Sequence, residues 1–227
     1  MNQLLENSVL EAAFPESPEK NPGALHHTSM PKSSPLDFLF QRIEHYITLT
    51  NEDRELILQL FKEEHVAKNQ VLLKEGEVCR KIFFIARGVL RFSKMVEGED
   101  RTFVFRPEGA FVSDIESFRR RTPSSNTITT VGPCILFTIS HDDMEYFYRN
   151  ICQGERFGRL VIEEVFIMAV THLTTFYSDS PEQRYLRFVK QHKNLLQRIP
   201  QYHIASYLGV TPQALCRIKK KLLQSDL

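Results

Sequence analysis

The sequence predicts an α+β protein that begins with an antiparallel β jelly roll, continues through one long dimerisation helix and ends in a helix-turn-helix domain. Three observations support this order. Short runs of β-branched and aromatic residues separated by glycine turns fill the middle of the chain, a long stretch of helical periodicity follows, and a helix-turn-helix pattern lies near the C-terminus. The length of 227 residues allows one large domain or two small ones.

Residues 1–35 are rich in proline, serine and glutamate and have no sustained periodicity, so we expect a disordered N-terminal extension. Either Met1 or Met30 can serve as the natural start, and both readings stay open. From residue 36 to residue 60, apolar side chains recur at helical spacing, interrupted by Thr50 as a helix cap. Helices are therefore expected before the first strand.

The jelly roll is expected within residues 36–150. The predicted strands coincide with five apolar runs, at residues 82–85, 89–92, 102–105, 127–131 and 135–139. Glycine-containing turn signals such as Arg87-Gly88 and Gly132-Pro133 stand between these runs. Many short strands with close turns are typical of an antiparallel sandwich or jelly roll.

Residues 151–178 are expected to form the dimerisation helix, because apolar residues recur there at intervals of three and four. A helix of this length buries its apolar stripe against another surface, and a second copy of the chain is the expected partner. A helix packed wholly within its own domain is the alternative. The longest uninterrupted apolar run, residues 166–170, is far too short to cross a membrane. The predicted interface comprises Phe157, Val161, Val165, Met168 and His172.

The charges of the chain are unevenly distributed. Residues 180–227 carry nine basic and two acidic side chains, a formal charge of +7, which leaves −6 for the first 179 residues. A basic segment attached to an acidic body is the charge distribution expected of a nucleic-acid-binding appendage. A solvated basic helix face is the alternative interpretation.

Residues 179–227 are expected to form a DNA-binding domain, with the helix-turn-helix motif at residues 201–218. Ala205 is small enough to let two helices cross closely, and Gly209 can adopt the positive φ that the turn requires. Thr211 and Pro212 suit the N-cap and the first position of the second helix. The expected core positions are Ile204, Leu208, Val210, Leu215 and Ile218.

The second helix of the motif has an outward stripe formed by Gln213, Cys216, Arg217 and Lys220. Gln213 and Arg217 are the expected base contacts, because glutamine can pair with adenine and arginine with guanine. The expected contacts to the DNA backbone are Thr211, Lys219, Lys220 and Lys221. The expected partner is double-stranded DNA with a palindromic operator, which matches the symmetry of a homodimer.

These motifs, in this order, resemble the cyclic-AMP receptor protein / fumarate-nitrate regulator (Crp/Fnr) superfamily of bacterial transcription regulators. The chain is similar in particular to the orphan-ligand branch common in Bacteroidetes. The resemblance covers about residues 36–223 and rests on Glu75-Gly76-Glu77, FIARGVLR (84–91), Gly109-Ala110-Phe111, Ser117-Phe118 and IASYLGVTP (204–212). It implies a cyclic-nucleotide-binding-like sensor jelly roll, a dimerisation helix and a helix-turn-helix, with RNA polymerase as a further partner.

The chain departs from this family at the phosphate cassette of its nucleotide-binding members. There the resemblance implies a Gly-Glu pair before a short helix and an arginine after it. This chain has Ser113-Asp114 in place of the pair, and Ser124, followed by Ser125, where the arginine is expected. Losing the only charged phosphate partner removes a contact that a buried anion needs. We therefore expect a degenerate ligand pocket that does not bind cyclic AMP in the usual way.

Two alternatives are kept. In the first, the same DNA-binding role is gated by an unidentified small-molecule or anionic effector in the jelly roll. The second, more distant alternative is a cupin-like enzyme, but residues 71–139 lack the histidine and glutamate constellation that a cupin metal site needs. We find no catalytic motif, so no enzymatic activity and no catalytic residue are expected.

No metal or other cofactor is expected. The four cysteines lie far apart without zinc-binding spacing, and residues 1–35 contain no cysteine for an iron–sulfur centre. The N-terminus lacks a basic segment followed by an apolar run, so secretion is not expected and the cytoplasm is the expected location, with no membrane partner.

Overall fold

Two short helices precede the first strand, as the apolar spacing predicts. Helix α2 spans Pro35–Glu44 and helix α3 spans Asn51–Leu60, and each begins with a reciprocal capping box, formed by Ser34 with Asp37 and by Thr50 with Asp53. The computed structural model describes residues 34–192 and 195–225. The extension expected at residues 1–35 therefore lies outside the described residues, except for its last two positions.

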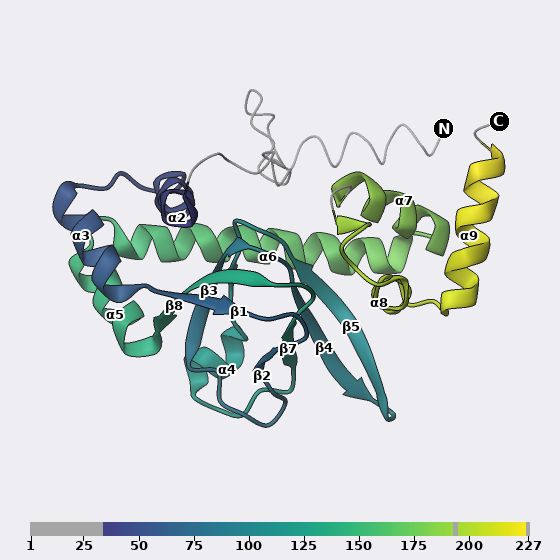
Figure 1. The fold of residues 1–227 in the computed structure, drawn as a ribbon, viewed down its shortest axis with the longest axis horizontal. Helices are drawn as coiled ribbons and strands as arrows, with labels where there is room; N and C mark the ends of the chain where they lie inside the picture. Colours follow the sequence, from purple (N-terminus) through teal and green to yellow (C-terminus); the bar gives the residue numbers. More distant parts are fainter. Residues whose placement is uncertain (1–33, 193–194, 226–227) are drawn as a thin grey trace, which may run out of the picture.

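The described residues contain eight strands in two antiparallel four-stranded sheets (Figure 1), which confirms the predicted jelly roll. The order in one sheet is β1-β8-β3-β6 and in the other β2-β7-β4-β5. The first sheet consists of β1 (Lys62–Val66), β8 (Cys134–Ser140), β3 (Lys81–Arg87) and β6 (Phe111–Val112). The second consists of β2 (Val71–Leu73), β7 (Thr127–Thr130), β4 (Leu90–Val96) and β5 (Glu99–Arg106).

Each of the five predicted apolar runs overlaps a strand, whereas β1, β6 and the three-residue β2 were not predicted. Strand β1 is mostly polar, and it is held by its pairing with β8, from Lys62 opposite Thr138 to Val66 opposite Cys134. Strand β6 has only two residues, which is too short for alternation to be recognised. Pairing with neighbouring strands, rather than a local sequence pattern, therefore forms β1 and β6.

Gly88 joins β3 to β4 with a φ of +110°, close against β8. A Cβ atom at this position would lie 2.3 Å from the Sγ atom of Cys134. Only glycine satisfies both the backbone conformation and the close approach. The turn signal Arg87-Gly88 therefore marks a point where the two sheets are brought together.

The core lies between the sheets and is continued by the helices that cover them. Fully buried side chains from both sheets, among them Phe84, Leu90, Ile128 and Leu136, meet in the interior. Helix α4 (Ile115–Arg120) follows β6, and helix α5 (His141–Asn150) follows β8. The side chain of Phe157, on the following helix, packs against Phe111 and Phe147 and closes one side of this core.

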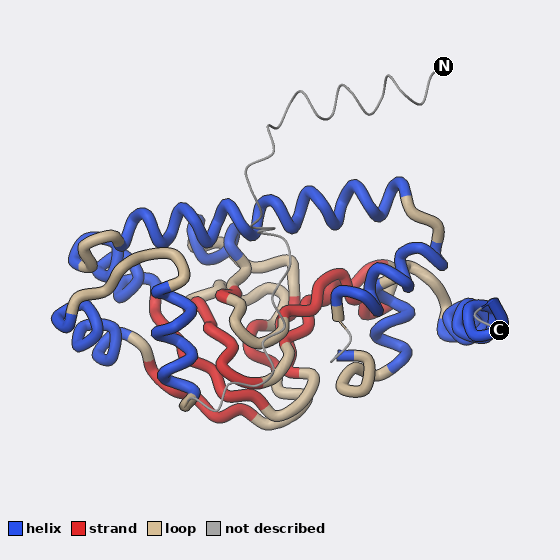
Figure 2. The backbone as a smooth tube through the Cα atoms, turned by 90° about the horizontal axis from the view of Figure 1, so that it is seen from above, coloured by secondary structure: helices blue, strands red, loops and turns tan. Residues whose placement is uncertain are grey.

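Helix α6 (Gly154–Ser178) runs along the whole molecule, past the sheets and toward the C-terminal helices (Figures 1 and 2). It is followed by α7 (Pro181–Gln191), α8 (Gln201–Tyr207) and α9 (Pro212–Ser225), and α9 lies at the far end from α3. In Figure 2 the described elements lie on one side of α6, which leaves the other side of this helix uncovered.

Candidate nucleic-acid interface and ligand pocket

Helices α8 and α9 form the predicted helix-turn-helix. The turn contains Gly209, whose φ is +69°, and the amide of Val210 donates a hydrogen bond of 3.0 Å to the carbonyl of Ala205. A left-handed residue followed by this bond is the usual way to end a helix at a glycine. The sequence prediction for the turn is therefore matched residue by residue.

The two helices share a small buried core. Ile204 and Ala205 on α8 are completely buried, and Ala205 has no side chain beyond Cβ that could hold the helices apart. The remaining contributors named from the sequence are buried or half-buried: Leu208, Val210, Leu215 and Ile218.

The predicted base-contacting residues lie on the exposed face of α9. Gln213, Cys216 and Arg217 are exposed, and Arg217 follows Gln213 by one helical turn. Thr211 caps α9, because its Oγ1 accepts a hydrogen bond of 3.2 Å from the amide of Ala214. The exposed face is thus polar, basic and preceded by an ordered helix N-terminus.

The three predicted backbone-contacting lysines are not equivalent. Lys219 is half-buried and donates a hydrogen bond of 3.1 Å to Oε1 of Gln201 on α8. Lys221 forms an ion pair of 3.5 Å with Glu182 on α7. Lys220 is exposed on the same side as Gln213 and Arg217. Lys219 and Lys221 therefore also contribute to holding the three C-terminal helices together.

The predicted pocket residues Asp114 and Ser124 are buried and bonded to each other. The hydroxyl of Ser124 donates a hydrogen bond of 2.6 Å to Oδ2 of Asp114, which also accepts one of 2.8 Å from Nδ2 of Asn126. Oδ1 of Asp114 accepts from the amide of Ser117 at 3.1 Å, which makes Asp114 the N-cap of α4. Burial raises the pKa of Asp114, but these hydrogen bonds outweigh it and hold the pKa below its usual range.

The remaining predicted pocket positions, Ser113 and Ser125, are less buried than Asp114 and Ser124. Ser113 is half-buried and Ser125 is exposed, and neither has a recorded hydrogen bond to Asp114. Asn126 takes part although sequence reasoning did not select it, because only the folded loop brings its amide to Asp114. The network extends through Ser117, whose hydroxyl donates to the carbonyl of Thr122 at 2.6 Å and accepts from the amide of Cys79 at 2.9 Å.

Two open surface hollows lie among the described residues, and neither includes the Asp114 network. One, of about 560 Å³, is lined by residues 148–156, and the other, of about 400 Å³, by Arg87 and by residues of β1 and β8. The interior between the sheets is filled by side chains, including the fully buried Phe84, Ile85 and Leu136. In the described residues no group of three or more cysteine, histidine, aspartate or glutamate side chains could hold a metal ion.

The predicted interface stripe on α6 faces the chain's own body. Phe157 is buried in the jelly-roll core, and Val161 packs against that core. The guanidinium of Arg106 contacts the sulfur of Met168, and Nδ1 of His172 lies 3.2 Å from the hydroxyl of Tyr207 on α8. Val165 is half-buried on the same side. Within one chain this face is therefore already partly covered by the chain's own residues.

A second apolar stripe occupies the opposite, uncovered side of α6. Phe166 is 67% exposed and Tyr177 is 83% exposed, and the intervening positions follow at helical spacing. The stripe consists of Ile162, Phe166, Val170, Leu173 and Tyr177, and is called the outer stripe below. By length and composition α6 is apolar enough to cross a membrane, contrary to the expectation from its short uninterrupted run.

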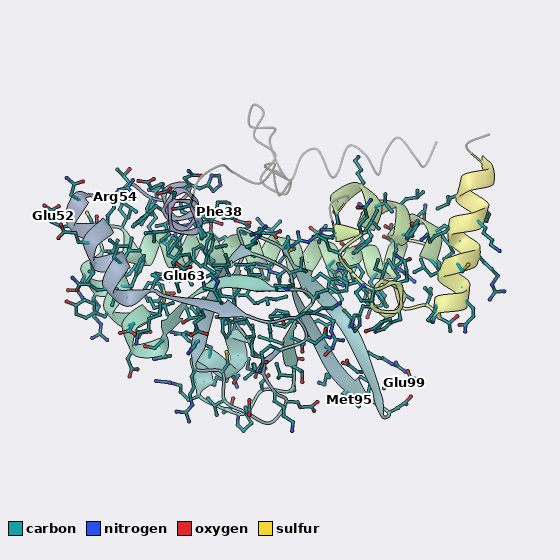
Figure 3. The ribbon with its side chains drawn as sticks, viewed as in Figure 1. Phe38, Glu52, Arg54, Glu63, Met95 and Glu99 are labelled. Atoms are coloured by element: carbon teal, nitrogen blue, oxygen red, sulfur yellow. The ribbon has the colours of Figure 1, made fainter. Side chains whose placement is uncertain are left out.

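The jelly roll and the helix-turn-helix share one packed interface. The side chains of Val89 and Phe105 join the core of the C-terminal helices, where the ring of Phe105 lies against Phe188 and Tyr207. Strand β5 also donates a hydrogen bond of 2.8 Å from the amide of Thr102 to Oγ of Ser206. Figure 3 labels Met95 and Glu99 at the free tip of the β4–β5 hairpin, beyond this contact.

Charged groups border the same interface. Arg198 pairs with Glu108, and the two closest atoms are 2.6 Å apart. Burial raises the pKa of Glu108, but the hydrogen bonds from Arg198 and the amide of Gly88 lower it below its usual value. On α8, burial and the neighbouring Arg91 lower the pKa of His203 to about 4. Residues so distant in the sequence left no signal from which this interface could be predicted.

Comparison with known proteins identifies the β domain. Residues 63–150 match the family model of the cyclic nucleotide-binding domain. No curated protein matched the chain. Among solved structures, FixK2 from Bradyrhizobium japonicum is 15% identical, with 74% of this chain and 86% of that chain covered and a TM-score of 0.63.

Two further structures have a similar fold. A protein from Eubacterium rectale assigned to the Crp/Fnr family of transcriptional regulators is 15% identical, covering 78% and 85% of the two chains with a TM-score of 0.63. The c-di-GMP-responsive global regulator CLP from Xanthomonas campestris is 14% identical, covering 78% and 94% with a TM-score of 0.59. The chain thus contains a cyclic nucleotide-binding domain, and its structural neighbours include Crp/Fnr proteins.

Proposed function

We propose that this chain is a homodimeric, sequence-specific DNA-binding transcription regulator of the Crp/Fnr type, of the orphan-ligand branch, acting in the cytoplasm. The observation that carries the proposal is the exposure of Gln213 and Arg217 on α9 of a helix-turn-helix with a complete core. In this proposal residues 36–150 are the sensor domain, residues 151–178 the dimerisation helix, and residues 179–227 the DNA-binding domain.

The DNA contacts follow from the face of α9. Gln213 and Arg217 would reach base edges in the major groove, where arginine pairs with guanine through two hydrogen bonds. Lys220 is the lysine best placed for a phosphate, because it shares this exposed face. Lys219 and Lys221 can reach phosphates after giving up their contacts with Gln201 and Glu182. Thr211 would contribute through the helix N-terminus that it caps.

The outer stripe of α6 supports a second copy of the chain, rather than lipid, as its cover. The opposite side of α6 is engaged with the soluble body: Glu164 accepts two hydrogen bonds from Arg42, at 2.8 and 2.9 Å, and one from Tyr46. A helix spanning a bilayer would have to break these contacts and bury the glutamate in hydrocarbon. Self-association covers the apolar side chains and leaves every one of these contacts intact.

The sensor domain is proposed not to bind cyclic AMP in the usual way. The donors of Ser124, Asn126 and the Ser117 amide are already used by the carboxylate of Asp114. A phosphate placed there would meet that negative charge without an arginine to offset it. The side chains that fill the space between the sheets support the same conclusion.

The test begins with mapping of genomic binding sites to obtain the operator. Arg217→Ala should then lower operator affinity by roughly 1–3 kcal/mol and relax the preference at one position of each half-site. Lys220→Ala is the matched control on the same face, and it should weaken all DNA alike and reduce the salt slope by about one per lost phosphate contact. If Arg217→Ala weakens operator and scrambled DNA equally across a salt series, the assigned recognition face is wrong.

The alternative function keeps the DNA-binding role but adds a small-molecule or anionic effector. The match of residues 63–150 to the cyclic nucleotide-binding domain favours this alternative, and CLP is described as responsive to c-di-GMP. Calorimetry with cyclic AMP and with c-di-GMP distinguishes the proposed function from the effector-gated alternative. A micromolar dissociation constant for either nucleotide, about −8 kcal/mol, would favour the effector-gated function.

A further inference from the structure

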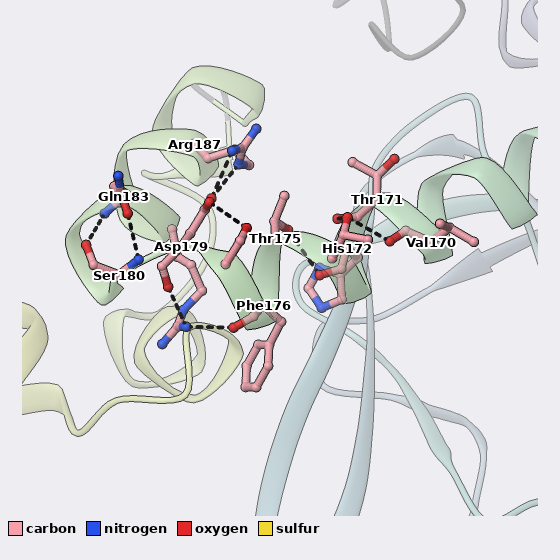
Figure 4. A network of polar contacts seen from close by, with 12 residues as sticks. Val170, Thr171, His172, Thr175, Phe176, Asp179, Ser180, Gln183 and Arg187 are labelled. Atoms are coloured by element: carbon pink, nitrogen blue, oxygen red, sulfur yellow. Dashed lines mark hydrogen bonds and ion pairs between the residues drawn. The ribbon is translucent and has the colours of Figure 1, made fainter. Parts of the chain in front are cut away.

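The connection between α6 and α7 is short and is held by a network of polar contacts (Figure 4). Helix α6 ends at Ser178, Asp179 adopts an extended conformation, and Ser180 begins α7 with a capping box in which it exchanges hydrogen bonds with Gln183 at 2.7 and 3.3 Å. Any change in direction between the long helix and the C-terminal helices must pass through this segment. The contacts that fix the geometry of this segment therefore also fix the position of α9.

Arg184 binds three carbonyl groups that belong to two different helix ends. Its Nη1 donates hydrogen bonds of 3.1 Å each to the carbonyls of Phe176 and Asp179, at the end of α6. Its Nε donates one of 3.2 Å to the carbonyl of Leu208, the C-cap residue of α8. The last carbonyls of a helix have no partner within the helix and carry the negative end of its dipole, so a guanidinium there is favourable.

The ring of Phe176 fills the space between Arg184 and the turn of the motif. The guanidinium lies 4.9 Å from the centre of this ring, in a cation–π arrangement. A Cβ atom built on Gly209 would lie 3.4 Å from the same ring. Arg184 and Phe176 therefore connect the end of α6 directly to the turn from which α9 begins.

Arg187 provides an internal comparison one turn further along α7. It is exposed and forms an ion pair of 2.9 Å with the side chain of Asp179. This pair lies within the same connection, but its acceptor is a carboxylate of the connection and not a carbonyl of α8. Arg184 and Arg187 thus have the same charge and both contact Asp179, but of the two only Arg184 reaches the helix-turn-helix.

We propose that Arg184 is a positioning residue that sets the direction of α9 relative to α6. The proposal rests on the DNA-binding function proposed above. In a dimer on two half-sites, both recognition helices must meet the major groove about one helical turn of DNA apart. The packing of α8 on β5 holds the first helix of the motif, and Arg184 holds the turn that leads into the second. Its planar, forked donors suit three carbonyls in a way that a lysine ammonium does not.

The first experiment measures this orientation without DNA. Cys152, beside the start of α6, and Cys216, on α9, are exposed, whereas Cys79 and Cys134 are buried. Spin labels on the two exposed cysteines report the distance between the two ends of the molecule. Labelled chains are diluted into an excess of unlabelled chains, so that distances within one chain dominate.

A single narrow distance distribution is expected for the wild-type chain and for Arg187→Ala. Arg184→Ala should broaden or shift the distribution, and Arg184→Lys should restore it only in part. Phe176→Leu keeps an apolar side chain and leaves Arg184 in place but removes the ring. This variant should also broaden the distance distribution. If Arg184→Ala and Phe176→Leu both give the wild-type distribution, the proposal is overturned.

The second experiment uses the mapped operator. Arg184→Ala should weaken binding to the complete operator by about tenfold or more, because two half-sites are no longer engaged together. It should leave the affinity for a single half-site and the salt slope near their wild-type values, because Arg184 contacts no phosphate in this proposal. Equal losses on the complete operator and on the single half-site would contradict a positioning role.

The two proposals fail in different ways. If the wild-type chain binds no DNA, the proposed function fails, while the distance measurement still decides whether Arg184 orients α9. Thermal unfolding of each variant, followed by circular dichroism, shows whether the chain is folded. If Arg184→Ala is unfolded, Arg184→Lys and Phe176→Leu decide the outcome by the same distance measurement.

Discussion

At the scale of single residues, Asp114 and Ser124 bind each other at the place of the predicted ligand pocket. The resemblance implies a glutamate and an arginine at the places of Asp114 and Ser124, which would each hold part of a nucleotide. In this chain the two residues bond to each other at 2.6 Å, and Asn126 and the Ser117 amide complete the carboxylate's shell. A buried carboxylate with this many donors is a structural element that contributes to the stability of the loop around α4.

Asp114→Asn should lower the free energy of unfolding at pH 7 by about 1–3 kcal/mol, because an amide group then faces donors that need an acceptor. The difference between variant and wild type should shrink at acidic pH. The folded-state pKa of Asp114 lies below its usual value, so its stabilisation is present above about pH 4 and disappears as the pH falls through the folded-state pKa.

Urea unfolding followed by far-ultraviolet circular dichroism measures this effect, since the chain contains no tryptophan. Ser125→Ala, at the exposed neighbouring serine, is the control and should change stability by no more than about 0.5 kcal/mol. A stability difference for Asp114→Asn that stays constant between pH 7 and pH 3 would contradict the role of the ionised carboxylate.

At the scale of secondary-structure elements, the contact of β5 with α8 joins the jelly roll to the C-terminal helices. His203 on α8 faces Arg91 of β4 and Asp100 of β5, which are bonded to each other at 2.7 Å. Burial and the positive charge of Arg91 make protonation of His203 unfavourable, while Asp100 opposes this effect. The interface therefore contains an imidazole that is neutral in the folded chain at pH values where a free histidine is charged.

This arrangement predicts that acid weakens the folded chain through His203. The folded-state pKa of about 4 is below the unfolded value of about 6.5, so the unfolded chain binds the proton first. Stability contributed by the neutral imidazole is full above about pH 6.5 and is lost as the pH falls toward 4. His203→Gln should flatten the change of unfolding midpoint between these pH values.

Nuclear magnetic resonance titration of the His203 ring gives the direct measurement, with an expected midpoint of about 4. A midpoint for His203 near that of an ordinary exposed histidine would mean that α8 is not held against β4 and β5 in solution.

At the scale of the whole molecule, α6 has two apolar sides, of which only the inner one is covered within the described chain. The inner side packs on the jelly-roll core and on Tyr207 of the helix-turn-helix, so its apolar side chains are already covered within one chain. The outer stripe is left without cover in the described chain. Burying exposed apolar area stabilises an assembly by roughly 25 cal/mol per Å². Binding of a second copy of α6 to the outer stripe is therefore favourable.

Phe166→Glu combined with Val170→Glu should convert the dimer to monomers, because two pairs of carboxylates would face each other in an apolar seam. Sedimentation measures the mass. Ile115→Glu combined with Tyr146→Glu is the control, since these side chains are similarly exposed on α4 and α5, away from the outer stripe. Unchanged dimers in the first variant would exclude the outer stripe as the interface.

The sequence was informative wherever structure depends on neighbours along the chain. The helix-turn-helix could be placed residue by residue, because Ala205, Gly209 and Thr211 each meet a local steric or hydrogen-bonding need within one turn of α8 or α9. The five predicted strands followed from runs of β-branched and aromatic residues and from turn glycines for the same reason. The cap at Thr50 is equally local.

The tertiary structure decided what depends on contacts between distant segments. Periodicity located apolar stripes on α6 but could not tell which stripe meets the chain's own sensor domain, because both sides of the helix are apolar. Periodicity also could not show that Val165 and Met168, named for the predicted interface, lie on the side that faces the chain's own body. The bond between Asp114 and Ser124, the packing of β5 on α8 and the reach of Arg184 to Leu208 each join residues that only folding brings together.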